Sequence, residues 1–377
     1  MDDYADRDGD SGDSGDHYRA PLLLHSLAEF RELIFRCLDL AEVTSVAEIG
    51  AEDGHFTREL LRWSDGRDIR VVAIDPAPSP PLVELANANP RLELIAKTSI
   101  AAFAHMAPVD AYLIDGDHNY YTVTNELRLI EEGTDGEFPI VFMHDVGWPC
   151  GRRDQYYAPD QIPEAERHDY TYDRGVVPSS AGVVSGGFRG EGEFAVAVVE
   201  GGPRNGVQTA IDDFVDRRGD LGYGTVPCVF GLGVLYPRDA SYAQAVTDFL
   251  SRYEDEPLLE RLERNRLDQY LALLGLQDSS ATTIAQLALA LEQAKLHIRD
   301  LETENKALWA RQHELIDRAD RANAEWATTR ATTDRLTVVL RRLLASDPYR
   351  AADFVARRRS GAPSRRDVEA ILTELDD

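Results

Sequence analysis

The residues of this sequence that could do chemistry gather first at the end of an apolar run. Residues 112–118 read Tyr-Leu-Ile-Asp-Gly-Asp-His, so Asp115, Asp117 and His118 follow a predicted buried strand. Carboxylates favour hard cations such as Mg²⁺, Mn²⁺ or Ca²⁺ over zinc. Histidine titrates near neutral pH, so His118 is the candidate general base for taking a proton from a hydroxyl group.

A second apolar run ends in the same residue types. Residues 141–145 read Val-Phe-Met-His-Asp and place His144 and Asp145 at the tip of the next predicted strand. Neighbouring strand tips meet at one edge of a parallel sheet, so we expect both residues to lie beside Asp115. These three residues are the predicted ligands of a divalent cation, with Mg²⁺ expected. The alternative for His144, and for Asp117, is a hydrogen-bonding role that orients the loops.

A glycine turn earlier in the chain predicts a nucleotide-like ligand. Residues 45–54 read Ser-Val-Ala-Glu-Ile-Gly-Ala-Glu-Asp-Gly, and a helical pattern follows at once. Gly50 and Gly54 let the backbone turn sharply and approach a ligand, and open α/β sheets bind ligands at such turns. The next predicted strand ends in Asp75, an acid placed to bind both hydroxyls of a ribose.

These motifs resemble those of the class I S-adenosylmethionine (SAM) methyltransferases, with Glu48, Gly50 and Gly54 in motif I. The segment Asp-Gly-x-His-x-Tyr that begins at Asp115 resembles more narrowly the metal-dependent sugar O-methyltransferases of the macrolide-sugar type. The resemblance covers roughly residues 40–237. It implies SAM as the cofactor and a sugar or glycosylated metabolite as the methyl acceptor.

The resemblance also implies roles for single residues. Asp115 would be a metal ligand, His118 the general base and Asp145 a second ligand. Related enzymes often have a second acid where this chain has His144, so cation binding could be weaker, differently completed or absent. The expected cofactor contacts are Glu48, Gly50, Glu52, Gly54, Asp75, Ser99 and Asp115.

Strands and helices alternate over this region, which predicts a parallel sheet covered on both faces. The resemblance implies an α/β fold with the seven-stranded, Rossmann-like sheet of class I methyltransferases, whose seventh strand is antiparallel. A helix is expected at 206–217, before the last strand. The strands are expected at 45–50, 69–75, 92–96, 110–115, 139–144, 193–199 and 226–235.

Residues 146–192 form a long interval that is rich in tyrosine, arginine and glycine. A loop of this length inside a domain is usually functional or disordered, and its aromatic residues favour a substrate lid over disorder. Tyrosines can stack on a sugar ring, and arginines can grip a phosphate or carboxylate. The expected substrate contacts are Tyr120, Arg152, Arg153, Tyr156 and Tyr157.

Composition limits the function further. The 377 residues carry a net charge of -27, which argues against a nucleic-acid partner because phosphate binding needs a basic face. No apolar stretch reaches membrane-spanning length and no signal pattern opens the chain, so we expect a cytoplasmic protein. Three widely spaced cysteines predict reduced thiols. Residues 1–20 are expected to be a disordered acidic tail and 21–256 the methyltransferase domain.

Residues 257–346 predict a helical segment for self-association. Apolar residues keep a 3,4 spacing over 284–343, which is typical of a coiled coil and predicts a homo-oligomer. Asn305 and Gln312 fall at a positions, where a buried polar residue can fix the register. The alternative is a weak, solvated midsection of a single helix.

Residues 347–377 predict short helices with an arginine-rich patch. This patch could dock on the acidic domain, meet an anionic membrane surface, or be a solvated face. Its members are Arg357, Arg358, Arg359, Arg365 and Arg366.

The sequence thus predicts a SAM-dependent O-methyltransferase that acts on a sugar-type hydroxyl with the help of a metal. One rival is methylation of a phenolic or other small-molecule hydroxyl on the same fold. A rival from another class is a SAM-binding scaffold or chain-length regulator of polysaccharide synthesis, with the coiled coil as a spacer.

Overall fold

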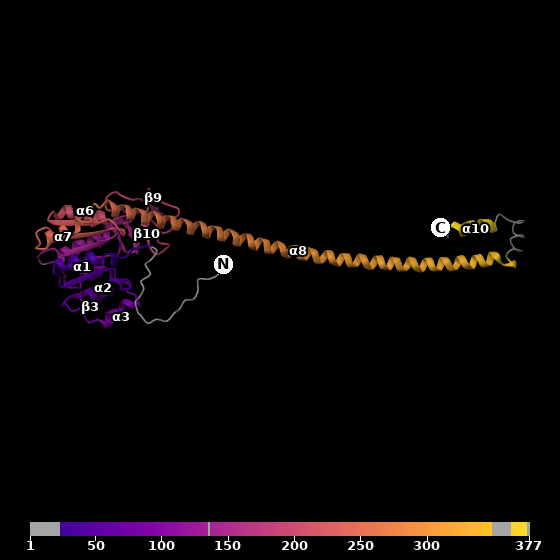
Figure 1. Ribbon diagram of the computed structural model, residues 1–377, viewed down its shortest axis with the longest axis horizontal. Coiled ribbons are helices and arrows are strands. Elements are labelled where there is room, and N and C mark those ends of the chain that lie inside the picture. The colour runs from indigo at the N-terminus through magenta and orange to yellow at the C-terminus, as the bar shows by residue number, and fades with distance from the viewer. Residues whose placement is uncertain (1–22, 135, 349–362, 375–377) are drawn as a thin grey trace. The chain divides into compact units, whose positions relative to one another are not determined.

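The computed structural model describes residues 23–134, 136–348 and 363–374 (Figure 1). The chain divides into two compact units, Met1–Thr282 and Thr283–Asp377.

Two expectations fall outside the described residues. These are the acidic tail at 1–20 and part of the arginine-rich patch, namely Arg357, Arg358 and Arg359.

The first unit is built on one seven-stranded sheet, as expected. The strand order is β11-β12-β5-β4-β1-β2-β3, and β12 is antiparallel to both of its neighbours. The pairs from β3 to β5 are parallel, so the sheet is mixed and the α/β fold is confirmed. The strands are β1 (Ser45–Ile49), β2 (Arg70–Ile74), β3 (Leu92–Ile95), β4 (Ala111–Ile114), β5 (Ile140–His144), β11 (Leu221–Val226) and β12 (Leu232–Pro237).

Both faces of the sheet are buried, which explains why its central strands are apolar without interruption. In β1, Val46 faces one core and Ala47 the other, and Val71 and Val72 divide in the same way. The first core packs under η1 (Leu27–Phe30), α1 (Arg31–Leu40), α2 (His55–Trp63), α3 (Pro80–Ala88) and α7 (Ala243–Leu250). The second packs under α4 (Ser99–Ala102), α5 (Tyr120–Gly133) and α6 (Val207–Arg218).

The sixth and seventh strands differ from the expected ones. Residues 193–199 are not in the main sheet, because β10 (Ala195–Ala197) pairs with β6 (Gln155–Tyr156) and β7 (Tyr170–Thr171). The sixth strand is β11, which follows α6. Its two glycines weaken the strand signal in the sequence. They are needed for space, since a Cβ on Gly222 would lie 2.5 Å from the Tyr236 ring.

The interval between β5 and α6 has secondary structure of its own. Besides the three-stranded sheet it contains the hairpin β8 (Gly175–Val177) and β9 (Ser180–Val184). Two short helices precede it, η2 (Pro159–Gln161) and η3 (Glu164–Glu166). This insertion runs through residue 206, further than the expected 146–192.

The last long element is α8 (Pro257–Ala345), which begins in the first unit and continues in the second. The 284–343 stretch keeps its apolar side chains exposed, with Ile284 and Leu308 each 66% accessible. α10 (Arg365–Glu374) follows and buries Leu372. Among the described residues, no helix is both long enough and apolar enough to cross a membrane.

Candidate active site

Four side chains form the centre of the candidate site at the tips of β4 and β5. Asp115 follows β4, and His118 lies just before α5. His144 ends β5, and Asp145 follows it with a φ of 59°. Because β4 and β5 are hydrogen-bonded parallel neighbours, their tips meet at one edge of the sheet, as the sequence predicts.

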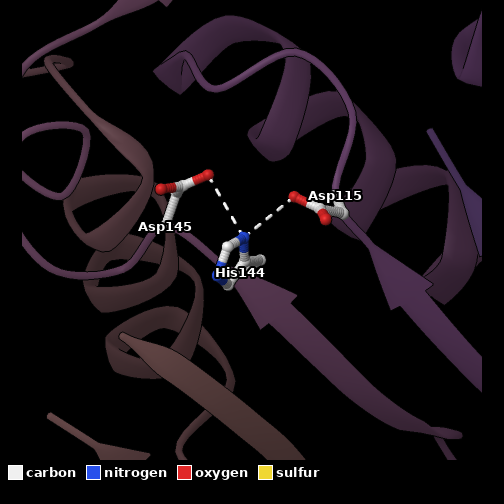
Figure 2. Close-up of side chains that lie close together, drawn as sticks. All are labelled: Asp115, His144 and Asp145. Carbon is white, nitrogen blue, oxygen red and sulfur yellow. Dashed lines mark hydrogen bonds and ion pairs between the residues drawn. The ribbon is translucent and has the colours of Figure 1, made fainter. Parts of the chain in front are cut away.

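The ring of His144 lies between two carboxylates (Figure 2). Its Nδ1 is 3.0 Å from Oδ1 of Asp115 and 3.3 Å from Oδ2 of Asp145. Its Nε2 is 2.9 Å from the carbonyl oxygen of Val229. A carbonyl oxygen can only accept, so Nε2 carries a hydrogen. Nδ1 therefore faces both carboxylates, either with a second hydrogen or with a lone pair.

The charges of this cluster favour a proton or a cation at Nδ1. Burial works against protonation of His144, but the carboxylates of Asp115 and Asp145 outweigh it and raise the pKa of His144 to about 10. Burial would raise the pKa of Asp115, yet His144 and His118 hold it below its usual value. A bare lone pair between two anions would be repelled.

These donors fit a divalent cation. Asp115, His144 and Asp145 each offer one ligand atom, and the three atoms lie within 4.8 Å of one another. Two carboxylates and one imidazole suit an ion such as Mg²⁺ or Mn²⁺. A histidine that binds a metal usually donates its other N–H to a carbonyl or carboxylate, and His144 donates to Val229 in this way.

His118 faces the same two carboxylates from the other side. Its Nε2 is 3.1 Å from Oδ2 of Asp145 and 3.4 Å from Oδ1 of Asp115. Burial would lower the pKa of His118, but Asp145 and Asp115 raise it well above its usual value. Its Nδ1 is buried without a hydrogen-bond partner among the described residues. Nε2 is therefore the atom that could exchange a proton with a group bound at the cluster.

The glycine turn lies directly against the tip of β4. Gly50 has a φ of 84°, and a Cβ built on it would be 2.0 Å from the carbonyl oxygen of Asp115. Glu48 is buried and accepts a hydrogen bond of 2.5 Å from Thr57 of α2. Burial raises its pKa to about 8, the Thr57 bond opposes this, and Asp115 adds to it. Gly54 then caps the N-terminus of α2 with a φ of 74°.

Asp75 closes the other side of the turn. Its Oδ2 accepts the backbone N–H of Glu52 at 2.8 Å, and its Oδ1 accepts that of Ala77 at 2.8 Å. Each oxygen keeps a second lone pair, so these bonds orient the carboxylate and leave it able to accept from a ribose hydroxyl. Glu52 has a φ of 45°, which places this residue in the turn itself.

Ser99 is buried in the first turn of α4. Beside it lies Glu126 of α5, a fully buried carboxyl whose pKa burial raises to about 8. Neither carboxylate oxygen of Glu126 accepts a hydrogen bond from the described part of the chain, and the nearby Ser99 hydroxyl offsets part of the rise in its pKa. The sequence does not predict that Glu126 is buried. The inner face of α5 is recognised from its apolar residues, and a glutamate would be expected on the exposed face.

Two of the expected substrate contacts support the insertion instead. Arg153 is 1% exposed and donates to the carbonyl oxygens of Ala197 and Ala181. Tyr156 is fully buried, and its hydroxyl donates to Asp154 at 2.7 Å. These side chains hold the small sheet of the insertion together, so neither is free to contact a substrate.

Two further expected contacts are paired with α6. Arg152 forms an ion pair of 2.7 Å with Asp212 and bonds Thr209. Tyr120 donates its hydroxyl to Asp213 at 2.8 Å. Arg153 is thus not available for the expected grip on an anion, and the role stays a prediction for Arg152, whose side chain is 49% exposed.

Tyr157 is the expected substrate contact that lies at the cluster. Its ring centroid is 6.1 Å from that of His118, and it is 51% exposed. Its backbone N–H donates to Asp117, which also accepts from Thr122. Asp117 therefore orients the loops, which is the second of the two roles considered for it.

Sequence reasoning missed an aromatic cluster that continues from Tyr157. The ring of Phe194 is 6.0 Å from that of Tyr157, and Phe188 stacks on Phe194 at 5.9 Å. Trp148 meets Phe188 edge to face, and its Nε1 is buried without a partner among the described residues. No local signal links these residues, since they join only when the insertion folds.

Comparisons with known proteins agree with this picture. A family model described as a methyltransferase domain matches residues 47–146, which contain the glycine turn and the tips of β4 and β5. No curated protein matches the sequence.

The chain is also similar to solved structures of methyltransferases, at low identity and with TM-scores below 0.5. One from Geobacter sulfurreducens is 12% identical with a TM-score of 0.31 and covers 58% of this chain and 82% of its own. The S-adenosylhomocysteine-bound PaMTH1 of Podospora anserina is 13% identical with a TM-score of 0.33, covering 55% and 77%. The 1,6-didemethyltoxoflavin-N1-methyltransferase of Burkholderia thailandensis is 13% identical with a TM-score of 0.34, covering 56% and 78%.

Proposed function

We propose that this protein is a SAM-dependent O-methyltransferase that activates the acceptor hydroxyl at a divalent cation. The observation that carries the proposal is the convergence of two sites at one edge of the sheet. The glycine turn with Glu48 and Asp75 lies against the backbone of Asp115, and the Asp115 side chain belongs to the acid and histidine cluster. A methyl donor and an acceptor hydroxyl bound at these sites would be neighbours.

The chain would bind the donor with the turn and with Asp75. The Asp75 carboxylate is held by the N–H groups of Glu52 and Ala77, and its free lone pairs would accept the ribose hydroxyls. Glu48 lies buried behind the turn, where a carboxylate would favour the positive charge of SAM. Gly50 lets the backbone come close.

The cluster would then prepare the acceptor. Asp115, Asp145 and His144 would hold the cation, which when bound lowers the pKa of a coordinated hydroxyl. His118 would take the proton at Nε2, the nitrogen that faces both carboxylates. Methyl transfer is an in-line displacement, so alignment of the acceptor oxygen with the methyl group would lower the barrier further.

The acceptor is proposed to be a sugar or glycosylated metabolite. The half-exposed ring of Tyr157 beside His118 supports it, because an aromatic ring can stack on the apolar face of a sugar. A phenolic acceptor is the second candidate. It is favoured by the burial of Arg153, by the ion pair of Arg152 with Asp212 and by the aromatic side chains that adjoin Tyr157.

The test is methyl transfer from radiolabelled SAM to a panel of glycosides and phenols, measured with and without EDTA. We expect turnover that EDTA abolishes and that Mg²⁺ or Mn²⁺ restores. Turnover that is insensitive to EDTA would remove the cation from the proposal. Calorimetry with S-adenosylhomocysteine completes the test, because binding without methyl transfer to any acceptor would favour the SAM-binding scaffold or chain-length regulator over the enzyme.

A further inference from the structure

The loop between β11 and β12 holds two consecutive residues in an unfavourable conformation. Val229 has a φ of 49° and Phe230 a φ of 63°, and neither is a glycine. Left-handed backbone is rare for a β-branched residue such as valine. Such a conformation persists only where neighbouring groups hold it.

Glu263 of α8 holds this loop. Its Oε2 accepts the backbone N–H of Val229 at 3.0 Å, and its Oε1 accepts that of Phe230 at 2.9 Å. Successive N–H groups in such turns form a concave site for an anion, and here a carboxylate of the same chain fills it.

Arg266, one turn further along α8, fixes the carboxylate in turn. Its Nε donates to Oε2 of Glu263 at 2.7 Å and its Nη2 to Oε1 at 2.6 Å. Its Nη1 donates to the carbonyl oxygen of Leu24, and its guanidinium lies 4.6 Å from the centre of the Phe230 ring. We call Glu263, Arg266, Val229 and Phe230 the α8 clamp.

The clamped loop touches the candidate cation site at two points. The carbonyl oxygen of Val229 accepts the Nε2 hydrogen of His144 at 2.9 Å. The carbonyl oxygen of Phe230 accepts the backbone N–H of Gly147, two residues after Asp145, at 2.6 Å. The loop thus sets both the orientation of the His144 ring and the path of the chain that carries Asp145.

We propose that Glu263 is a positioning residue for the cation site and acts through Val229 and His144. The inference rests on the cation site of the proposed function. By holding the Val229 carbonyl in place, the clamp keeps the hydrogen on Nε2 and turns Nδ1 toward Asp115 and Asp145. The direct hydrogen-bond partner of a metal-binding histidine, here the Val229 carbonyl, typically contributes 10–100-fold to metal affinity.

The test compares Mn²⁺ binding to the full-length protein and to Glu263→Ala, by calorimetry and by electron paramagnetic resonance. We expect the variant to bind Mn²⁺ about 10-fold more weakly, the lower end of that range because Glu263 acts through Val229, with an unchanged affinity for S-adenosylhomocysteine. Glu260→Ala removes an equal charge from the exposed face of the same helix and should bind Mn²⁺ like the wild type. Equal Mn²⁺ affinity in Glu263→Ala and wild type would overturn the proposal.

A second variant separates positioning from general loss of structure. Glycine adopts left-handed backbone without strain, so Val229→Gly in the Glu263→Ala background should restore part of the Mn²⁺ affinity. No recovery, with both proteins folded by circular dichroism, would contradict the loop as the link. Glu263→Gln keeps one acceptor oxygen and should lose less Mn²⁺ affinity than Glu263→Ala. This variant replaces Glu263→Ala in the test if the alanine variant does not fold.

Nitrogen NMR of the His144 ring gives a readout that needs no metal. We expect the Nε2 hydrogen to exchange slowly with solvent in the wild type, because it is bonded to the Val229 carbonyl, and to exchange faster in Glu263→Ala. Wild-type protein that binds no Mn²⁺ would remove the cation from the proposed function, and the ring signal would still decide whether Glu263 positions His144. An unchanged ring signal in Glu263→Ala would remove the positioning role.

Discussion

The protonation states of the four residues at the strand tips, Asp115, His118, His144 and Asp145, depend on one another. His144 and His118 each face Asp115 and Asp145, and the two carboxylates raise the pKa of both rings. A cation that binds Asp115 and Asp145 would withdraw this stabilisation from the imidazolium form of His118. The ring would then be neutral more readily and able to accept a proton.

His118→Ala should lower kcat by about 10²–10⁴-fold, the usual contribution of a general base. The affinity for SAM should not change, because the donor contacts come from the glycine turn and Asp75. The measurement is initial rate at saturating SAM together with calorimetry. His105→Ala is the matched control, since His105 is exposed. A full rate in His118→Ala would remove the base assignment.

Glu48 predicts a pH dependence of SAM binding. Burial raises its pKa to about 8, so it is mostly protonated at neutral pH without ligand. The positive charges of SAM favour the ionised carboxylate of Glu48. Below about pH 8, SAM binding must therefore remove the proton from Glu48. Affinity should therefore rise from about pH 6 to about pH 8 and then level off. Glu48→Gln should give a flat profile, and the same slope in that variant would assign the effect to another group.

Among the elements, the turn between β1 and α2 joins the two halves of the site. The N–H of Gly50 donates to the carbonyl oxygen of Ile74 at 2.9 Å, and Asp115 donates its N–H to Ile49 at 2.9 Å. The ends of three strands are thereby drawn together around the turn. A side chain at position 50 would separate the turn from the tip of β4.

Gly50→Ala and Gly66→Ala form a matched pair for this turn. Both glycines have left-handed backbone, with φ of 84° and 72°, but a Cβ on Gly66 meets nothing within 4 Å. Gly66→Ala should cost about 1–2 kcal/mol from the backbone alone. Gly50→Ala should cost more and abolish binding of S-adenosylhomocysteine. Denaturant unfolding and calorimetry measure both, and equal stabilities would show that the contact with Asp115 is unimportant.

The insertion owes its structure to polar side chains that the sequence suggests for binding. Asp154 accepts the N–H groups of Tyr120 and Gly206 and the hydroxyl of Tyr156. Arg153 joins Ala197 to Ala181. Buried polar groups destabilise the fold unless they form hydrogen bonds. The hydrogen bonds of Arg153 and Asp154 fix the path of the chain beside the acid and histidine cluster.

For the molecule as a whole, α8 serves two purposes along one helix. In the first unit its Glu263 and Asp278 bond the β11–β12 loop and Arg189 of the insertion. In the second unit its apolar stripe remains exposed, as in Leu301 and Trp326 at 49% and 63%. A stripe of that kind is stabilised by a second helix that covers it.

The full-length protein should therefore self-associate through 284–343. In a parallel pair in register, Asn305 and Gln312 face the same residues of the second copy. In an antiparallel pair a positions face d positions, which are mostly apolar in this stretch, and a polar group would be buried without a partner. Sedimentation velocity should show an oligomer at micromolar concentration, and a monomer would contradict the prediction. Asn305→Leu should strengthen association and relax the choice of strand number.

Much of this site could be predicted because each of its parts is marked by a short, continuous stretch of sequence. Apolar runs that end in Gly50, Asp75, Asp115 and His144 mark strand tips, and parallel strands bring such tips to one edge whatever the remaining sequence is. The 3,4 spacing of 284–343 is local in the same sense and predicts the helix that is observed there, while its self-association stays a prediction. For the strand tips and this helix the sequence alone determined the arrangement.

Other features depend on pairs of segments that only the tertiary structure brings together. The pairing of β11 with β12 and the burial of Arg153 are of this kind. So is the path from Glu263 through Val229 to His144. Periodicity indicates which face of a segment is buried. It does not indicate which distant carbonyl or carboxylate will form hydrogen bonds with the residues of that face. The tertiary structure therefore decided which polar residues hold the site and which remain available for a substrate.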